Sequence, residues 1–117
     1  MQQPPIHRHN PTALWSDAVI HQGTAYFVEI PESGESFAEQ LSALLAQTER
    51  TLAAIGSDKS RLLLATIYLP DMTHRAELNE RWGQWLPEGC APARVCVKAE
   101  LASPDWLIEI AFTAACS

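Results

Sequence analysis

Residues 36–70 read SFAEQLSALLAQTERTLAAIGSDKSRLLLATIYLP, and the rest of the chain can be arranged around this segment. Ser36 and Glu39 have the spacing of a capping box, in which each side chain binds a backbone N–H at the start of a helix. One apolar stripe, at spacings of three and four, predicts a helix that stops at Gly56. The stripe consists of Phe37, Leu41, Leu44, Leu45, Thr48, Leu52 and Ile55. Residues 62–69 are almost continuously apolar, which predicts a central strand covered on both faces.

Two β-prone segments come before the helix. Residues 16–21 and 24–30 are joined by a polar residue and a glycine, which predicts a β-hairpin. Residues 1–12 contain three prolines and no periodicity, so we expect a flexible segment there. The remaining residues, 13–117, are then expected to form a single domain.

A second helix and two further strands are predicted after the central strand. Asp71 or Thr73 can cap this helix. Its apolar face carries Leu78, Trp82, Trp85 and Leu86. Strands are predicted at about 93–101 and 106–114. The predicted order is therefore ββαβαββ, an α+β fold in which one mixed sheet carries two helices on one face.

The composition limits the classes of function. The chain has 117 residues, 47% of them hydrophobic, so one domain can bury a core. Its formal charge of -6 argues against a phosphate-backbone binder, and we expect no nucleic-acid partner. The apolar runs are too short to cross a bilayer, so no membrane association is expected. Three cysteines without CxxC spacing favour a reduced, cytoplasmic protein.

Side chains alternate between the two faces along the last two predicted strands. Val95 and Val97 point one way in the first of them, and Arg94 and Cys96 point the other way. In the last strand, Glu109 points away from an apolar set of Ile108, Ile110 and Phe112. We expect both apolar sets to pack against the helices, which places Arg94, Cys96 and Glu109 together on the far face.

An arginine and a glutamate on that face suggest a binding or catalytic site. Two helices leave one face of the sheet uncovered, and sister subunits commonly cover such a face. The guanidinium of Arg94 suits a ligand carboxylate, and Glu109 could polarise a water or act as acid or base. The alternative is a structural ion pair between the two. In a simple hairpin they would be offset by about three residues, roughly 10 Å along the strand.

Other polar residues carry weaker hypotheses. Cys96 could be a nucleophile, but no histidine adjoins it, so a buried or pocket-lining thiol is preferred. His7 and His9 could bind a metal ion, but without further ligands no metal site is expected. Asp17 and Glu29 are expected to be solvated.

The segment from Ala91 to Val97, followed by Ile108-Glu109-Ile110, resembles the signature of the RidA/YjgF reactive-intermediate deaminases. Residues 15–19 resemble the opening strand motif of that family, and the likeness spans about residues 13–115. The resemblance implies a chorismate-mutase-like fold and a homotrimer with clefts between subunits. It also implies hydrolysis of 2-imino acids or their enamine tautomers to 2-keto acids and ammonia, without a metal or organic cofactor.

By position, the resemblance implies a role for five residues. Arg94 would bind the substrate carboxylate, and Glu109 would position or activate the attacking water. Cys96 would line the pocket and Asn79 would lie at its rim. Trp15 would also line it, where active deaminases of the family often carry tyrosine.

Two other functions are left open. Trp15 and a shortened strand over residues 27–31 depart from the family pattern, which favours a trimer that binds small carboxylates without turning them over. RNA cleavage has been attached to relatives of this fold, but the acidic charge disfavours it here.

Overall fold

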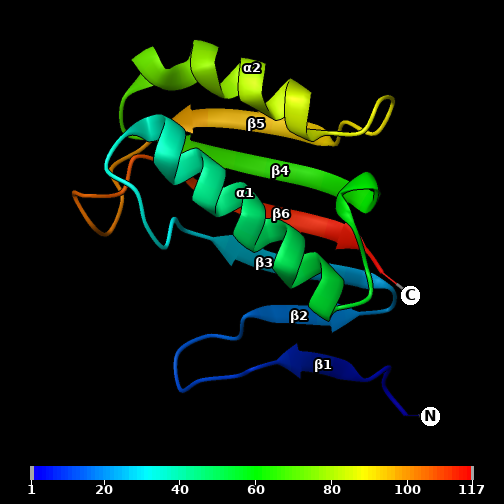
Figure 1. Ribbon diagram of the computed structural model, residues 1–117. Helices are drawn as coiled ribbons and strands as arrows, with labels where there is room; N and C mark the ends of the chain where they lie inside the picture. Colours follow the sequence, from blue (N-terminus) through cyan, green and yellow to red (C-terminus); the bar gives the residue numbers. More distant parts are fainter. Residues whose placement is uncertain (1, 117) are drawn as a thin grey trace.

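The computed structural model describes residues 2–116 and contains a six-stranded sheet with both α-helices on one face (Figure 1). The strands are β1 (Ile6–His9), β2 (Ala18–His21), β3 (Thr24–Glu29), β4 (Leu62–Leu69), β5 (Ala93–Lys98) and β6 (Glu109–Ala115). The helices are α1 (Phe37–Ala54) and α2 (Arg75–Trp85), with short 3-10 turns at Lys59–Arg61 and Met72–His74. The strand order is β1-β2-β3-β6-β4-β5, with β4 and β5 parallel and the other neighbours antiparallel. The predicted α+β architecture is confirmed.

The N-terminal segment differs from the prediction. Residues 1–12 were expected to be flexible, but Ile6–His9 forms β1, which pairs with β2 along its whole length. The strand ends where Asn10 turns with φ of 48°, and the N–H of Asp17 then donates to the carbonyl of His9 over 2.9 Å. The described order is therefore βββαβαββ. Only four residues form this strand, too few for a two-residue alternation to stand out in the sequence.

The predicted hairpin and first helix are confirmed. Gln22 and Gly23 have φ of 51° and 78°, the left-handed pair that a tight hairpin turn requires. At the start of α1, the N–H of Glu39 donates to the Ser36 hydroxyl over 3.1 Å, and the N–H of Ser36 donates to the Glu39 carboxylate over 3.0 Å. Gly56, with φ of 74°, lies just beyond the helix, as predicted.

The core lies between the helices and one face of the sheet. Phe27 of β3 and Phe112 of β6 stack there with ring centroids 5.2 Å apart, and Trp82 of α2 lies 6.3 Å from Phe112. The largest fully buried side chains are Leu41, Leu44, Thr48, Leu52, Ile67, Leu69, Leu78, Ile108 and Ile110. Both helices therefore use the apolar faces that the sequence predicted.

The opposite face of the sheet is uncovered. Along β4, Ala65, Ile67 and Leu69 are buried under the helices, whereas Leu64 on the other face is 39% exposed. The prediction that this strand is covered on both faces is wrong for a single chain. Tyr26 and Val28 of β3, 51% and 57% exposed, extend the same apolar surface. Packing within the chain therefore explains the apolar residues on the helix side of β4, but not those on its uncovered face.

The last two strands do not form a hairpin. β4 lies between β5 and β6 and pairs with both. β5 ends at Lys98 and β6 begins at Glu109, so each strand is about three residues shorter at this connection than the predicted 93–101 and 106–114. Among residues 2–116, no helix is both long and apolar enough to cross a membrane.

Candidate functional site

Arg94 lies on β5, at one edge of the sheet. It pairs with Ala65 of β4, and paired residues point to the same face. Because Ala65 is buried under the helices, Arg94 also points to the helix side. Its guanidinium donates a hydrogen bond of 2.6 Å to the side-chain oxygen of Asn79 on α2. The expectation that Arg94 lies on the far face is therefore wrong.

The wrong prediction for Arg94 comes from the distribution of side chains over the two faces of β5. Val95 and Val97 were expected to pack against the helices, but they lie on the uncovered face and are 46% and 37% exposed. Cys96 points to the helix side with Arg94 and packs against the edge of the core while remaining half-buried. Alternation identifies the helix-covered face only where the uncovered face of the sheet is polar, and on β5 it is the uncovered face that carries the apolar side chains.

Glu109 begins β6 and lies on the uncovered face, as predicted. Its neighbours in the sequence, Ile108 and Ile110, are fully buried under the helices. The register pairs Glu109 with Tyr68, three residues beyond the residue that pairs with Arg94. The Cα atoms of Arg94 and Glu109 are therefore roughly 14 Å apart, and their side chains point to opposite faces.

This arrangement excludes the structural alternative within one chain. Arg94 and Glu109 cannot form an ion pair in the same chain. Among residues 2–116, no carboxylate lies within ion-pair distance of Arg94, and its hydrogen bond to neutral Asn79 leaves its charge uncompensated. Arg94 is half-buried as a residue, and its guanidinium has N–H groups left to donate beyond the bond to Asn79.

Trp15 lies near the opposite edge of the sheet from β5, in the loop between β1 and β2. The Thr12 hydroxyl orders this loop by accepting from the N–H groups of Leu14 and Trp15 over 3.2 and 3.1 Å. Trp15 is 63% exposed and borders a cavity of about 1000 Å³. Arg94, Asn79, Cys96 and Glu109 do not border it. The structure therefore brings Arg94, Asn79 and Cys96 together and separates Glu109 and Trp15 from them.

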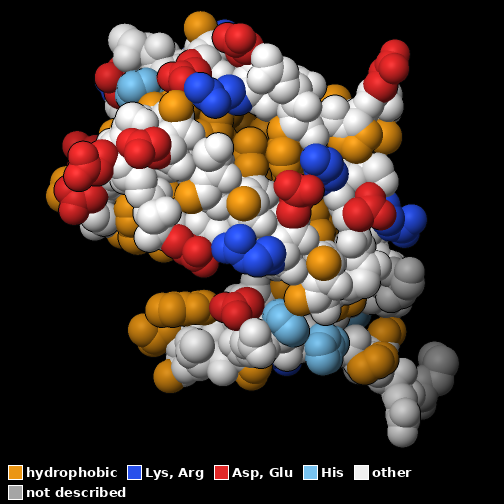
Figure 2. All heavy atoms as spheres, viewed as in Figure 1, with side chains coloured by type: hydrophobic (Ala, Val, Ile, Leu, Met, Phe, Trp, Pro, Cys, Tyr) orange, Lys and Arg blue, Asp and Glu red, His pale blue; other side chains and the backbone are white. Residues whose placement is uncertain are grey.

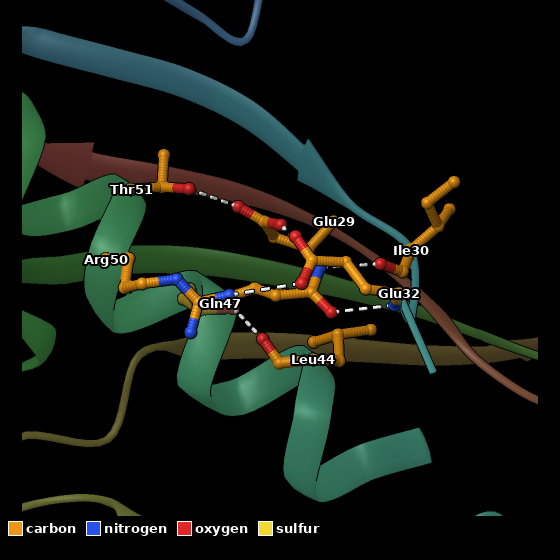
Figure 3. Close-up of polar contacts among 8 residues, drawn as sticks. Glu29, Ile30, Glu32, Leu44, Gln47, Arg50 and Thr51 are labelled. Atoms are coloured by element: carbon orange, nitrogen blue, oxygen red, sulfur yellow. Dashed lines mark hydrogen bonds and ion pairs between the residues drawn. The ribbon is translucent and has the colours of Figure 1, made fainter. Parts of the chain in front are cut away.

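The same cavity borders a buried carboxyl group on Glu29 of β3 (Figure 3). Thr51 of α1 donates to Glu29 over 2.6 Å, and the amide of Gln47 donates to its other oxygen over 3.3 Å. Glu29 is only 8% exposed. Burial raises the pKa of its carboxyl above the usual 4.5, and the nearby Glu32 raises it further, although the two hydrogen bonds oppose the shift. The expectation that Glu29 is solvated is wrong.

Gln47 also holds the chain that leaves β3 (Figure 3). Its amide donates to the carbonyl of Ile30 over 2.7 Å and accepts from the N–H of Glu32 over 2.8 Å. Arg50, one turn away on α1, pairs with the carboxylate of Glu32 over 3.2 Å. The sequence did carry a signal for this burial, because Glu29 continues the two-residue alternation of buried Ala25 and Phe27.

The charges on the helix side are mixed. Figure 2 shows basic side chains scattered among acidic ones on this face rather than gathered into one patch. His7 and His9 lie on β1, and no group of three histidine, cysteine or acidic side chains within residues 2–116 could hold a metal ion.

The fold and these residues define the class of protein. A mixed sheet of this order with two helices on one face is a chorismate-mutase-like α+β fold, and it carries an arginine on an edge strand and a glutamate on the uncovered face. A family model described as Endoribonuclease L-PSP matches residues 5–116. The chain belongs to this family, which is the RidA/YjgF family.

Known relatives support the assignment over nearly the whole chain. The RutC family protein YoaB of Escherichia coli K12 is 41% identical over 111 residues, which cover 94% of this chain and 97% of the relative. A RutC family protein of Haemophilus influenzae is 40% identical over 114 residues, 95% of this chain and 98% of the relative. The crystal structure of a YjgF-family protein from Neisseria meningitidis has a TM-score of 0.95 and 43% identity, with 99% of this chain and 98% of that chain covered. These names state a family and no reaction.

Proposed function

We propose that this chain hydrolyses reactive 2-imino acids and their enamine tautomers to 2-keto acids and ammonia. The observation that carries the proposal is the state of Arg94. The residue is half-buried, its charge is not neutralised by a carboxylate among residues 2–116, and its hydrogen-bond partner is the neutral side chain of Asn79. A planar cation with free parallel donors binds a carboxylate well.

The proposed site forms between copies of the chain. Arg94 and Glu109 point to opposite faces, so a ligand held by Arg94 can meet Glu109 only from a second copy. The uncovered face around Glu109 is apolar and includes Tyr26, Val28 and Val95, a surface that copies of the chain would cover. We propose a homotrimer, in agreement with the family resemblance. Trp15 and Cys96 would line the clefts of this assembly.

The reaction needs little beyond positioning and one proton carrier. The carbon of a protonated imine is already electrophilic, so fixing the substrate carboxylate on Arg94 orients it for attack. The carboxylate of Glu109 accepts a proton from a water molecule while the water oxygen bonds to that carbon. Returning the proton to nitrogen lets the C–N bond break, and the hydroxyl becomes the carbonyl of the 2-keto acid. Ammonia leaves with the remaining proton.

A test uses an imino acid made in place by an amino-acid oxidase, with keto-acid and ammonia release compared with the rate without protein. We expect acceleration by the wild-type protein and at least about a hundredfold less by Arg94→Ala and Glu109→Gln, since each removes one function of the site. Arg81→Ala serves as the control, because Arg81 forms only an exposed pair with Glu77. Equal rates for the wild-type protein and Arg94→Ala would reject the proposal.

The alternative is a trimer that binds small carboxylates without turning them over. Trp15 favours it, because an indole ring cannot supply the hydroxyl that tyrosine would bring to the cleft. This function predicts carboxylate binding that Arg94→Ala abolishes and no acceleration of imine hydrolysis. Turnover that depends on Glu109 would exclude it.

The net charge and the free thiols bear on the substrate class and on the cellular compartment. The formal charge of -6 makes an RNA substrate the weakest choice, despite the description of the family model. Cys90, Cys96 and Cys116 are free thiols, as expected in a reducing compartment such as the cytoplasm.

A further inference from the structure

We propose that Asn79 is a positioning residue that fixes the guanidinium of Arg94 and, because it is neutral, keeps the positive charge available for a carboxylate. The inference rests on the proposed binding of a carboxylate by Arg94. It assigns Asn79 a role through Arg94, whereas the resemblance implied a place at the rim of the pocket.

The contact itself carries the inference. The hydrogen bond from Arg94 to the Asn79 side-chain oxygen measures 2.6 Å, at the short end for such bonds. Arg94 projects from an edge strand and would otherwise have a long side chain free to move. One bond to a helix residue removes much of that freedom and still leaves the other N–H groups for a ligand.

The position of Asn79 on its helix is well defined. The α2 helix follows a turn capped by Asp71, whose carboxylate accepts from the N–H of Thr73 over 2.9 Å. Leu78, the residue before Asn79, is fully buried and anchors the helix against the core. The amide oxygen is therefore presented to β5 from a rigid element.

Charged side chains of both signs lie on the two elements that form this contact. The side chains of β5 that share its face are Arg94, Cys96 and Lys98. The charged residues of α2 are Arg75, Glu77, Glu80 and Arg81, and Glu77 is paired with Arg81 over 2.9 Å. An aspartate in place of Asn79 would have almost the same shape but would put a carboxylate where the amide oxygen now binds Arg94. It would then compete with the ligand for the guanidinium.

Two substitutions of Asn79 separate a positioning role from a structural one. If Asn79 mattered only for packing or folding, Asn79→Asp would disturb the protein less than Asn79→Ala, because it preserves the shape. If Asn79 positions Arg94 and must be neutral, Asn79→Asp weakens carboxylate binding more than Asn79→Ala. The readout is which of the two variants binds the carboxylate more weakly.

The experiment measures the binding of pyruvate, a simple 2-keto acid, by calorimetry at pH 7.5, with the thermal midpoint of each variant recorded. We expect binding about fivefold weaker for Asn79→Ala, from one lost hydrogen bond, and more than about tenfold weaker for Asn79→Asp. Gln84→Glu adds the same charge at an exposed position of α2 and should bind pyruvate like the wild-type protein. Pyruvamide lacks the carboxylate, so its affinity should be the same for the variants as for the wild-type protein.

The outcomes are distinguishable from those of the proposed function. Wild-type binding that Arg94→Ala abolishes but neither Asn79 variant changes would overturn the positioning role and leave the proposed function standing. Asn79→Asp milder than Asn79→Ala would also overturn it. A wild-type protein that binds no pyruvate would overturn both the inference and the carboxylate site on which it rests. In the imine assay, we expect the Asn79 variants to raise KM more than they lower kcat, because Asn79 does not touch the reacting atoms.

Discussion

Arg94 and Glu109 lie on opposite faces of one sheet, on strands that flank β4. Each residue is well placed by its own strand, and the sheet itself separates them. If both act on one ligand, each site takes Arg94 from one copy of the chain and Glu109 from another. The two side chains can then be tested independently in mixed oligomers.

Mixed oligomers of Arg94→Ala and Glu109→Gln should regain activity that neither variant has alone. A random mixture assembles some clefts with an intact arginine from one copy and an intact glutamate from the next. With equal amounts of the two variants, about a quarter of the clefts are intact, so about a quarter of wild-type activity is expected. The measurement is imine hydrolysis after the variants have been unfolded together and refolded.

Mixing without subunit exchange provides the control for this experiment. Variants combined at the assay, with no unfolding step, should stay inactive until their subunits exchange. A refolded mixture as inactive as its components would contradict a site shared between copies and would require both residues to act within one chain.

The uncovered sheet face should be the surface through which copies associate. Val28 is 57% exposed on that face, opposite Ala111 of β6, and its side chain does not support the core. We expect Val28→Lys to remain folded but to sediment as a smaller species, because a lysine in an apolar interface is desolvated without a partner. Sedimentation velocity should give three times the 12.9 kDa of the chain for the wild-type protein and one chain mass for the variant. Ala53→Lys on the exposed side of α1 is the control, and equal masses for all three proteins would exclude this face as the interface.

Local signals in the sequence predicted most elements, since local forces form them. The capping box at Ser36, the left-handed turn at Gln22 and the stop at Gly56 depend on neighbouring residues, and each is found where the sequence indicated it. The strand at Ile6–His9 was missed because pairing with β2, rather than any local pattern, makes it a strand.

The candidate site was harder to predict because it depends on which face of each strand is covered. Glu109 was placed correctly, since its strand has one apolar and one mixed face. Arg94 was misplaced because Val95 and Val97 are apolar yet uncovered in the single chain. A face that another copy of the chain would cover, as we propose for this one, has the composition of a core, so the alternation along β5 alone cannot separate the two.

The buried carboxyl of Glu29 should make stability depend on pH. Burial raises its folded pKa above the unfolded value of 4.5, so the unfolded chain ionises first as pH increases. The free energy of unfolding therefore falls as pH rises from 4.5 through the folded pKa and then levels off. Glu29→Gln removes this titration, so its stability relative to the wild-type protein should increase over the same range. Urea unfolding followed by circular dichroism between pH 4.5 and 7.5 measures this difference, and a constant difference would contradict the assignment.

Glu39 should show the opposite dependence. Hydrogen bonds from the backbone and side chain of Ser36 lower the pKa of its carboxyl below 4.5. The stabilisation is therefore complete above pH 4.5 and is lost as pH falls through the lowered folded pKa. Glu39→Gln should be less stable than the wild-type protein at neutral pH, and the two unfolding curves should converge in acid. Curves that stay equally far apart at every pH would show that the charge of Glu39 has no part in capping α1.

Gly34 should tolerate substitution far less than Gly56, although both have positive φ. At Gly34, with φ of 109°, an added Cβ would lie 2.7 Å from the backbone nitrogen of Gln40, whereas at Gly56 it would meet nothing within 4 Å. We expect Gly34→Ala to lower the free energy of unfolding by about 3 kcal/mol and Gly56→Ala by about 1 kcal/mol.

Gln40 also donates to the carbonyl of Asp105 over 2.8 Å and accepts from the N–H of Leu107 over 2.8 Å, in the loop that leads to the glutamate of β6. Displacing Gln40 should therefore lower kcat for imine hydrolysis in Gly34→Ala but not in Gly56→Ala, and equal losses of stability and rate in the two variants would contradict this coupling.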